Sequence, residues 1–295
     1  MDQRQTKGER QMNYGLTCNG KLLTTDYSNI LGIPDPYNPY NLPAKTFRAQ
    51  YKQNTYPTTK YCAVTLVDNV QNIYDITYTG EYYSEYEVPF QSDKNLTNII
   101  GANTTDFTSC RNLFADCTAL QSMCEFDSSN IRDMASMFDN CYSLTSVKPI
   151  DMTNVSAVWD MFAVCDKLSA VNFYNTSNIK YFNHMFFSCT SLQSLPAEID
   201  ITNAVGALYM CYNCTALTSV PKLTTSSTPV TDNKLMQTDS MFFDCFSVQS
   251  GALAAYQKLA SLYPAVSSYN LTFHSCGNAT PQGAAELAQI PSDWK

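Results

Sequence analysis

Cysteine recurs along this chain at an almost constant interval. Six cysteines lie at positions 117, 141, 165, 189, 214 and 245, so the first four steps measure 24 or 25 residues and the last measures 31. A fixed period in the twenties is typical of a repeat protein, in which each unit buries its apolar face only against its neighbours. The chain is therefore expected to form a row of similar units.

Each of these cysteines closes a short phrase of the type Met-Phe-x-x-Cys and is followed three residues later by an aliphatic residue. Because the same residue types recur at the same phase, we predict that they form the buried core of every unit. The predicted core residues are Phe114, Cys117, Leu120, Met137, Phe138, Cys141, Leu144, Met161, Phe162, Cys165, Leu168, Met185, Phe186, Cys189, Leu192, Met210, Cys214, Leu217, Met241, Phe242 and Cys245.

The spacing within a unit suggests its secondary structure. After Ile131, the apolar residues Met134, Met137, Phe138 and Cys141 follow each other at helical spacing, and the preceding polar residues can cap a helix. The aliphatic residues after the cysteine fit a short strand. We therefore predict an α+β repeat fold, a leucine-rich-repeat-like solenoid of about six 24-residue units, each with one short strand and one short helix.

The cysteines allow three interpretations, which are disulfides, metal sites and buried thiols. The single C-x-x-C, Cys211 to Cys214, has no second pair and no nearby histidine, so it is a weak signal for a metal or a redox site. Stacked units would align the repeated cysteines in a ladder. We expect these cysteines to be buried free thiols.

The repeated phrase, together with the polar turn Asp-x-Ser/Thr-Asn that precedes it, resembles the BspA-like leucine-rich repeat of bacterial surface proteins, also called the Mycoplasma-lipoprotein-type repeat. The resemblance covers about residues 99 to 250 and implies an adhesive or recognition protein rather than an enzyme. The sequence departs from the pattern at Cys211, which replaces Phe. The C-terminal stretch, which includes Phe273 to Gly277 and Gly283 to Trp294, resembles the ending of repeat proteins from gut bacteriophages and related gut bacterial elements.

The chain outside the repeats divides into three further segments. Residues 1–43 are proline-punctuated and form a predicted extended arm, and residues 44–98 alternate apolar and polar residues as strands do, over Thr46–Tyr51, Tyr61–Val67 and Ile73–Tyr78. The repeats occupy residues 99–250. In residues 251–295, helical spacing of Leu253 and Tyr256 predicts a helical cap.

Charge separates the front of the chain from the remainder. The whole chain has a net charge of −8, whereas residues 1–60 carry a net charge of +4. The overall charge argues against a nucleic-acid partner, and no apolar run is long enough for a membrane span or a secretion signal. Two interpretations of residues 1–43 stay open: they anchor the chain on other virion or surface proteins, or they pack on the repeats of the same chain.

Residues that could carry chemistry are few. The two histidines, His184 and His274, are not part of a recognisable catalytic set, and we place His184 on a repeat helix as a solvent-facing spacer. The recurring turn residues Asp127, Asp151, Asn175 and Asp200 supply too few oxygens for calcium and are interpreted as turn and cap residues. No catalytic residue, cofactor or metal site is therefore predicted.

What remains is a surface that is rich in tyrosine and small polar residues. A ligand face is expected along the short strands, at Gln121, Thr145, Ser169, Gln193 and Thr218, and the alternative is that these residues only solvate a strand. We expect a non-enzymatic protein exposed on a bacteriophage virion, as a head or tail fibre or a decoration protein, that adheres to host or gut glycans or proteins. A bacterial cell-surface adhesin is the alternative. A homo-oligomer is also considered, as a trimer if the protein is a fibre.

Overall fold

The structure is a computed structural model that describes residues 17–18, 21–22, 40–53, 55, 57, 62–79, 88–226, 236–262 and 266–295. Most of the predicted arm at residues 1–43 lies outside the described residues, and so do Tyr61 and residues 227–233 of the longest repeat. Within residues 1–39, only the antiparallel pair β1 (Thr17–Cys18) and β2 (Lys21–Leu22) is described.

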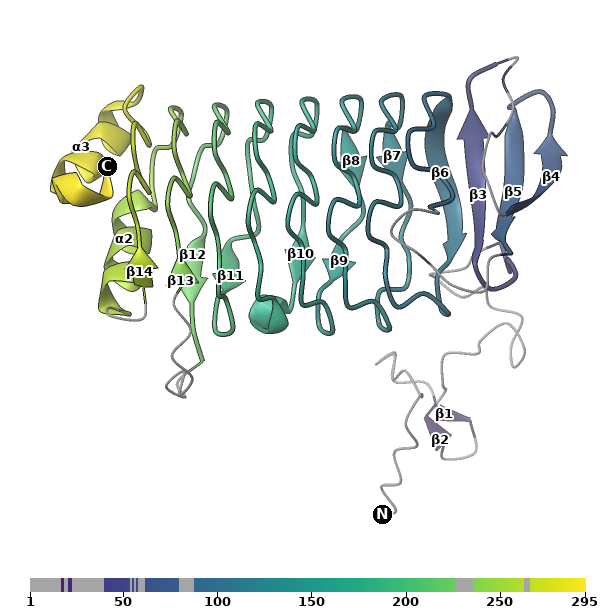
Figure 1. Ribbon diagram of the computed structural model, residues 1–295, viewed down its shortest axis with the longest axis horizontal. Helices are drawn as coiled ribbons and strands as arrows, with labels where there is room; N and C mark the ends of the chain where they lie inside the picture. The colour runs from purple at the N-terminus through teal and green to yellow at the C-terminus, as the bar shows by residue number, and fades with distance from the viewer. Residues whose placement is uncertain are drawn as a thin grey trace.

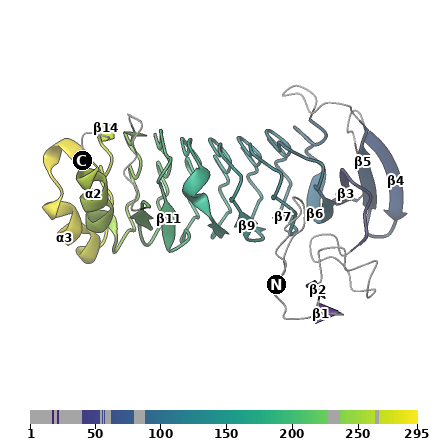
Figure 2. The same cartoon turned by 90° about the horizontal axis from the view of Figure 1, so that it is seen from below.

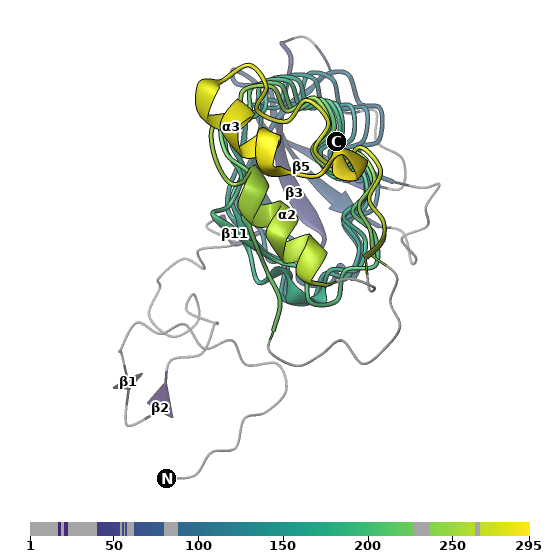
Figure 3. The ribbon, with the colours of Figure 1, turned by 90° about the vertical axis from the view of Figure 1, so that its left-hand side faces the viewer.

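From residue 88 onward the chain winds into a row of stacked coils, with strands at one end and helices at the other (Figures 1 and 2). Viewed from the helical end, the coils superpose on one oval outline (Figure 3). Parallel β-bridges join equivalent residues of successive coils, for example Ser109 to Asp133 and Asp133 to Ala157. The short strands of the coils are β7 (Ser122–Met123), β8 (Ser146–Val147), β9 (Ile150–Asp151), β10 (Phe173–Tyr174), β11 (Glu198–Asp200), β12 (Lys222–Thr224), β13 (Met236–Gln237) and β14 (Val266–Ser268).

The predicted fold class is wrong, because the Met-Phe-x-x-Cys phrase forms consecutive turns and not a helix. In the described residues, the two α-helices both follow residue 250, and the coils consist of short strands and turns. In the coil around Met137, the amide of Met137 donates within the coil to the carbonyl of Met134 at 3.2 Å. The next amide, that of Phe138, donates to Met161 of the following coil at 2.9 Å. Every second amide thus bonds to a neighbouring coil, which a helix cannot do.

Two left-handed residues in each coil, one just before the Met-Phe-x-x-Cys phrase and one within it, prevent helix formation. Ser136 and Asn140 have φ values of 53° and 58°, and equivalent residues in the other coils are also left-handed. Asn, Asp and Ser are common at these positions, and Asn and Asp tolerate this conformation because their short polar side chains bond locally. Val164, with a φ of 57°, is an exception, because a β-branched residue is strained there.

The core of the coils is a column of stacked rings beside a column of thiols. Phe138 stacks on Phe114 and Phe162 with centroid distances of 5.6 and 5.3 Å. The thiols of Cys141 and Cys165 donate to the carbonyl oxygens of Phe114 and Phe138, at 3.1 and 3.2 Å. All residues of the predicted core are buried. Every cysteine in the described side chains is a free thiol, as expected.

The coil geometry extends beyond the six predicted units. Before the first unit, Phe90 stacks on Phe114 at 5.2 Å, and the buried Asp93 takes the place of the repeated cysteine. After the last unit, Phe273 stacks on Phe242 at 5.7 Å, and Cys276 is buried. The last coil keeps the Phe-x-x-Cys part of the phrase, with Thr272 in place of Met, whereas the first coil keeps only the Phe.

The C-terminal residues cover the last coil (Figure 3). They form α2 (Ala252–Ser261), α3 (Pro281–Gln289) and the short 3-10 helix η2 (Ser292–Trp294). Thr280 caps α3 by accepting a hydrogen bond from the amide of Gly283 at 3.0 Å. The ring of Trp294 stacks on Tyr269 at 4.2 Å, so the end of the chain is packed against the last coil.

At the other end, one six-stranded sheet passes from antiparallel strands into the parallel coils, in the order β4-β5-β3-β6-β7-β8. Its long strands are β3 (Thr46–Tyr51), β4 (Cys62–Asp68), β5 (Ile73–Tyr78) and β6 (Leu96–Asn103). Strand β3 pairs antiparallel with β5 and β6, and β6 pairs parallel with β7. Strands β3 and β5 span the residues predicted as strands.

Candidate functional site

The five residues of the predicted ligand face are all exposed and lie at equivalent positions of successive coils. The amides of Thr145, Gln193 and Thr218 donate to the carbonyl oxygens of Gln121, Ser169 and Gln193 at 2.8–3.0 Å. The hydroxyls of Thr145 and Thr218 donate to carbonyl oxygens of the preceding coil as well. Because these hydroxyl protons are used within the stack, the stripe is a regular polar surface, and its role as a ligand face stays a prediction.

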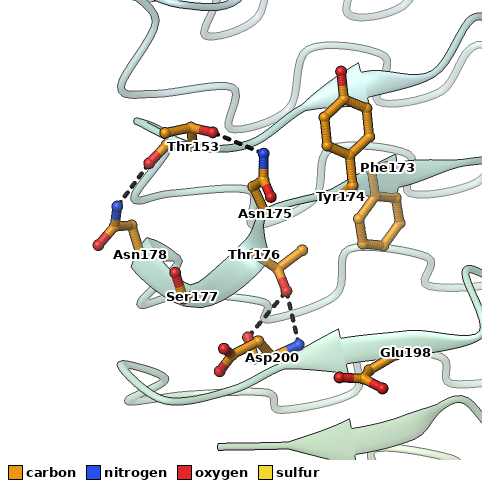
Figure 4. Close-up of a pocket in the computed structure, with 9 residues that line it drawn as sticks. All are labelled: Thr153, Phe173, Tyr174, Asn175, Thr176, Ser177, Asn178, Glu198 and Asp200. Atoms are coloured by element: carbon orange, nitrogen blue, oxygen red, sulfur yellow. Dashed lines mark hydrogen bonds between the residues drawn. The ribbon is translucent and has the colours of Figure 1, made fainter. Parts of the chain in front are cut away.

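A groove of about 520 Å³ lies elsewhere, between the coils that carry β10 and β11 (Figure 4). It is bordered by β10, by the 3-10 helix η1 (Thr176–Asn178) and by β11. The residues that line it are Thr153, Phe173, Tyr174, Asn175, Thr176, Ser177, Asn178, Glu198 and Asp200.

The groove opens where the parallel ladder between coils is interrupted. Strand β9 pairs with β10, and β11 pairs with β12, but β10 and β11 belong to different sheets. The hydroxyl of Thr176 bridges the interruption, because it donates to the carbonyl of Asp200 at 3.0 Å and accepts from the amide of Asp200 at 2.8 Å. Asn175 is left-handed, with a φ of 61°. The side-chain bridge thus replaces the backbone pairing that would close the gap.

The rim of the groove combines an aromatic ring with carboxyl and amide groups. The side chain of Tyr174 is 46 % exposed. Glu198 forms an ion pair with Lys222 at 3.1 Å, and the hydrogen bond from Lys222 lowers the pKa of Glu198. One carboxyl oxygen of Asp200 accepts from the amide of Thr202 at 2.8 Å, which fixes the orientation of the carboxyl group.

The amides of the groove are held in place by the preceding coil. The side-chain amide of Asn175 donates to Oδ1 of Asp151 at 2.9 Å and to the hydroxyl of Thr153 at 3.0 Å. The amide of Asn178 donates to the carbonyl of Thr153 at 2.6 Å. Fixed hydrogen-bonding groups beside an exposed ring are suited to a polyhydroxylated ligand such as a sugar.

Of the turn residues interpreted from sequence, Asp151 and Asp200 end strands β9 and β11, and Asn175 is at the N-cap position of η1 but makes no side-chain capping bond. Oδ1 of Asp127 accepts from the amide of Ser129 at 2.9 Å, and Asp151 and Asp200 make the same bond two residues ahead. Among the described side chains, no group of three or more His, Cys, Asp or Glu residues is arranged to hold a metal ion.

The histidines and the C-x-x-C pair lie apart from the groove. His184 lies in a turn and not on a helix, where it stacks on Tyr209 at 5.3 Å and lies 3.5 Å from Asp160. His274 stacks on Phe243 at 4.6 Å. Both thiols of the C-x-x-C pair are buried, and burial raises their pKa, which makes them poor nucleophiles.

The carboxyl groups of Asp116, Asp139 and Asp160 lie near one another in the turns of successive coils. Burial, with Asp160 and Asp116 nearby, raises the pKa of Asp139 to about 6. Burial also raises the pKa of Asp160. These groups have partners within the stack, such as the amide of Asn140, which donates to Asp116 at 3.1 Å. The cluster affects stability rather than forming a site.

Sequence reasoning named Asn175, Asn178 and Asp200 only as residues of polar turns and did not name Tyr174 or Glu198. No change of period marks the groove, because the repeated cysteines at 141, 165 and 189 stay 24 residues apart. The difference lies in the pairing between coils. Phe173 and Tyr174 pair with Ile150 and Asp151, a step of 23 residues, whereas the following bridge, Ala157 to Tyr181, is 24 residues apart. The left-handed Asn175 lies between these two steps.

Comparison with known proteins concerns the repeats. Residues 108–225 match the model of a family described as Mycoplasma protein of unknown function, DUF285, and the groove lies within this segment. No curated protein and no solved structure is significantly similar to the chain. In the described residues, no helix combines the length and the apolar character that crossing a bilayer requires.

Proposed function

We propose that this chain is a non-enzymatic recognition protein that binds a glycan in the groove between β10 and β11. The observation that carries the proposal is that the exposed ring of Tyr174 and the carboxyl groups of Glu198 and Asp200 line the same groove. Sugar rings present apolar faces that pack on an aromatic ring and hydroxyls that bond to carboxyl and amide groups. The amides of Asn175 and Asn178 are already oriented by the preceding coil, which lowers the entropic cost of binding.

Binding is tested by screening the full chain on a glycan array and measuring the affinity for the strongest ligand by calorimetry. Tyr174→Ala removes the ring, and the expected loss is about tenfold or more in affinity, since an aromatic contact contributes about 1 kcal/mol beyond the area that it buries. Tyr142→Ala is the matched control, because Tyr142 has a similar exposure of 41 % and does not line the groove. Equal affinities of the two variants would contradict the proposal.

A second pair of variants tests the polar side of the groove. Asp200→Asn keeps an oxygen that accepts from Thr202 but removes the charge, and Glu198→Gln removes the partner of Lys222. Both are expected to weaken glycan binding and to leave the thermal unfolding temperature nearly unchanged, because surface ion pairs contribute little to stability. Unchanged binding in both variants would show that the carboxyl groups do not contact the ligand.

We assign the repeats to the surface of a bacteriophage virion, with residues 1–43 as the anchor. The support is the net charge of +4 on residues 1–60, which suits an acidic docking partner, together with the resemblance of the C-terminal stretch to phage repeat proteins. Proteomics of purified particles tests this location. Absence of the chain from particles would reject the virion location. If particles retain the protein after deletion of residues 1–43, these residues are not the anchor.

The second candidate is a bacterial cell-surface adhesin of the BspA-like type. The observation that favours it is the similarity of residues 108–225 to a family of mycoplasma proteins. Recovery of the chain from the cell-surface fraction of a bacterium, with none in particles, would select this candidate. Glycan binding in the groove is expected in both locations.

A further inference from the structure

The outermost strand of the six-stranded sheet has one unpaired edge. Strand β4 pairs with β5 and ends the sheet at the end of the molecule opposite the helices (Figure 1). Among the described residues, no strand pairs with the other edge of Ala63–Leu66. Backbone donors and acceptors on a free edge can pair with a further strand.

The apolar face of the sheet continues onto β4 without a cover. Val64 pairs with Ile76 and Leu66 pairs with Tyr74, so these side chains lie on the same face as two buried core residues of β5. Val64 is nevertheless 43 % exposed and Leu66 is 53 % exposed. Val70, after the strand, is 77 % exposed. Val64 and Leu66 are alternate residues on one face of the strand, and exposed apolar neighbours of this kind mark an interaction surface.

Strand β4 also lacks most of the features that keep edge strands apart. Cys62–Val67 contains no charged residue and no proline, although the chain carries a net charge of −8. A register shift between Leu66 and Asp68 limits regular pairing to the first part of the strand. The free edge that remains is short and uncharged.

We propose that β4 pairs antiparallel with β4 of a second copy of this chain, about a two-fold axis at Val64. In this register Val64 lies opposite Val64 of the copy, and Cys62 lies opposite Leu66, so the core faces of the two sheets become continuous. On the other face, Ala63 lies opposite Thr65. The segment is complementary to itself, and no two like charges oppose each other across the axis.

The uncharged character of this segment selects a second copy as the occupant. A partner with a charged edge strand would leave its charges unpaired against Cys62–Val67, whereas the copy brings the same apolar residues. One short strand from each copy buries less than the roughly 1,600 Å² of a standard interface. The dimer is therefore concentration-dependent and forms at micromolar or higher protein concentration.

The experiment is sedimentation equilibrium of the full chain over a wide range of concentrations. The mass is expected to rise with concentration from 33.0 kDa toward twice this value. In the variant A63K/T65K, the lysine at position 63 of each copy lies opposite the lysine at position 65 of the other. The dissociation constant of its dimer is therefore expected to rise at least tenfold. The matched control T145K/S146K adds the same charge on exposed positions of another coil and should dimerise normally.

A charge-pair variant tests the register itself. In A63E/T65K the glutamate of one copy lies opposite the lysine of the other, so this variant should dimerise at least as well as the unmodified chain. The lysine at position 65 also lies next to Asp75 of β5, which is compatible with the monomer fold. Circular dichroism confirms that each variant is folded before sedimentation.

Three results would overturn the proposal. The first is a mass of 33.0 kDa at every concentration up to the hundred-micromolar range. The second is a limiting mass three times that of the chain, which would indicate a trimer. The third is a dimer that A63K/T65K does not weaken, or that A63E/T65K weakens as much, because either result would place the interface elsewhere.

Discussion

Replacing Phe162 by leucine tests whether the stacked rings hold the coils together. Phe162 is fully buried between Phe138 and Phe186, with centroid distances of 5.3 and 5.5 Å and interplanar angles of 9° and 3°. Leucine keeps most of the apolar volume but cannot stack. The substitution therefore separates ring stacking from simple burial.

The expected loss follows from these two contacts. A volume-conserving apolar substitution costs less than about 1.5 kcal/mol, and each aromatic pair contributes about 0.5–1.5 kcal/mol beyond burial. Phe162→Leu should therefore lower the free energy of unfolding by about 3 kcal/mol. Phe242→Leu is the matched control, because Cys211 precedes Phe242 in the column and, among the described rings, only Phe273 stacks on it, at 5.7 Å. Its expected loss is about 2 kcal/mol.

Urea unfolding followed by circular dichroism and by tryptophan fluorescence measures both losses. Trp159 lies in the middle coils and Trp294 at the C-terminal end, so fluorescence and circular dichroism transitions that coincide would show that the stack unfolds as one unit. Equal losses in Phe162→Leu and Phe242→Leu would refute the reasoning. A loss below about 1 kcal/mol in Phe162→Leu would refute it as well.

Three further substitutions have definite expected outcomes. Val164→Asn should raise the free energy of unfolding in urea by about 1 kcal/mol, because asparagine tolerates the left-handed backbone that strains valine, and a lower midpoint would contradict this reasoning. Asp139 has a folded-state pKa of about 6, above that of the unfolded chain, so its contribution to stability is lost as the pH rises from about 4 to about 6. Asp139→Asn should therefore stabilise the protein by about 1 kcal/mol at pH 7 after allowance for solvent screening, with little effect at pH 4, and an equal effect at both pH values in thermal unfolding would contradict this. Gly283→Ala would place a Cβ 2.1 Å from the carbonyl oxygen of Val248, so hydrogen exchange in α3 should become fast, and retained protection would contradict the close contact.

Much of the repeat could be predicted because its pattern is a recurrence of residue types along the chain. The same residue types return at the same phase, and stacking buries that phase whatever the local backbone conformation is. The buried core residues and the free thiols follow from this periodicity. Residues 108–225, which match the family model, contain five of the six repeated cysteines.

The backbone of the phrase could not be predicted, because apolar residues at positions 134, 137, 138 and 141 fit a helix and a series of tight turns equally well. The choice depends on where the amides bond. Phe138 donates to Met161 in the next coil, and such a bond exists only when that coil is in place. The left-handed residues Ser136 and Asn140 then orient alternate amides outward.

The sequence by itself determined the period, the buried phase and the polar turns, because these are properties of residues that recur along the chain. Only the tertiary structure decided the turn conformation, the groove and the free edge of β4. The groove depends on a one-residue shift in the pairing of β10, after which β10 and β11 belong to different sheets, and the free edge depends on strand order. Both features arise from contacts between segments far apart in the chain, which no local pattern encodes.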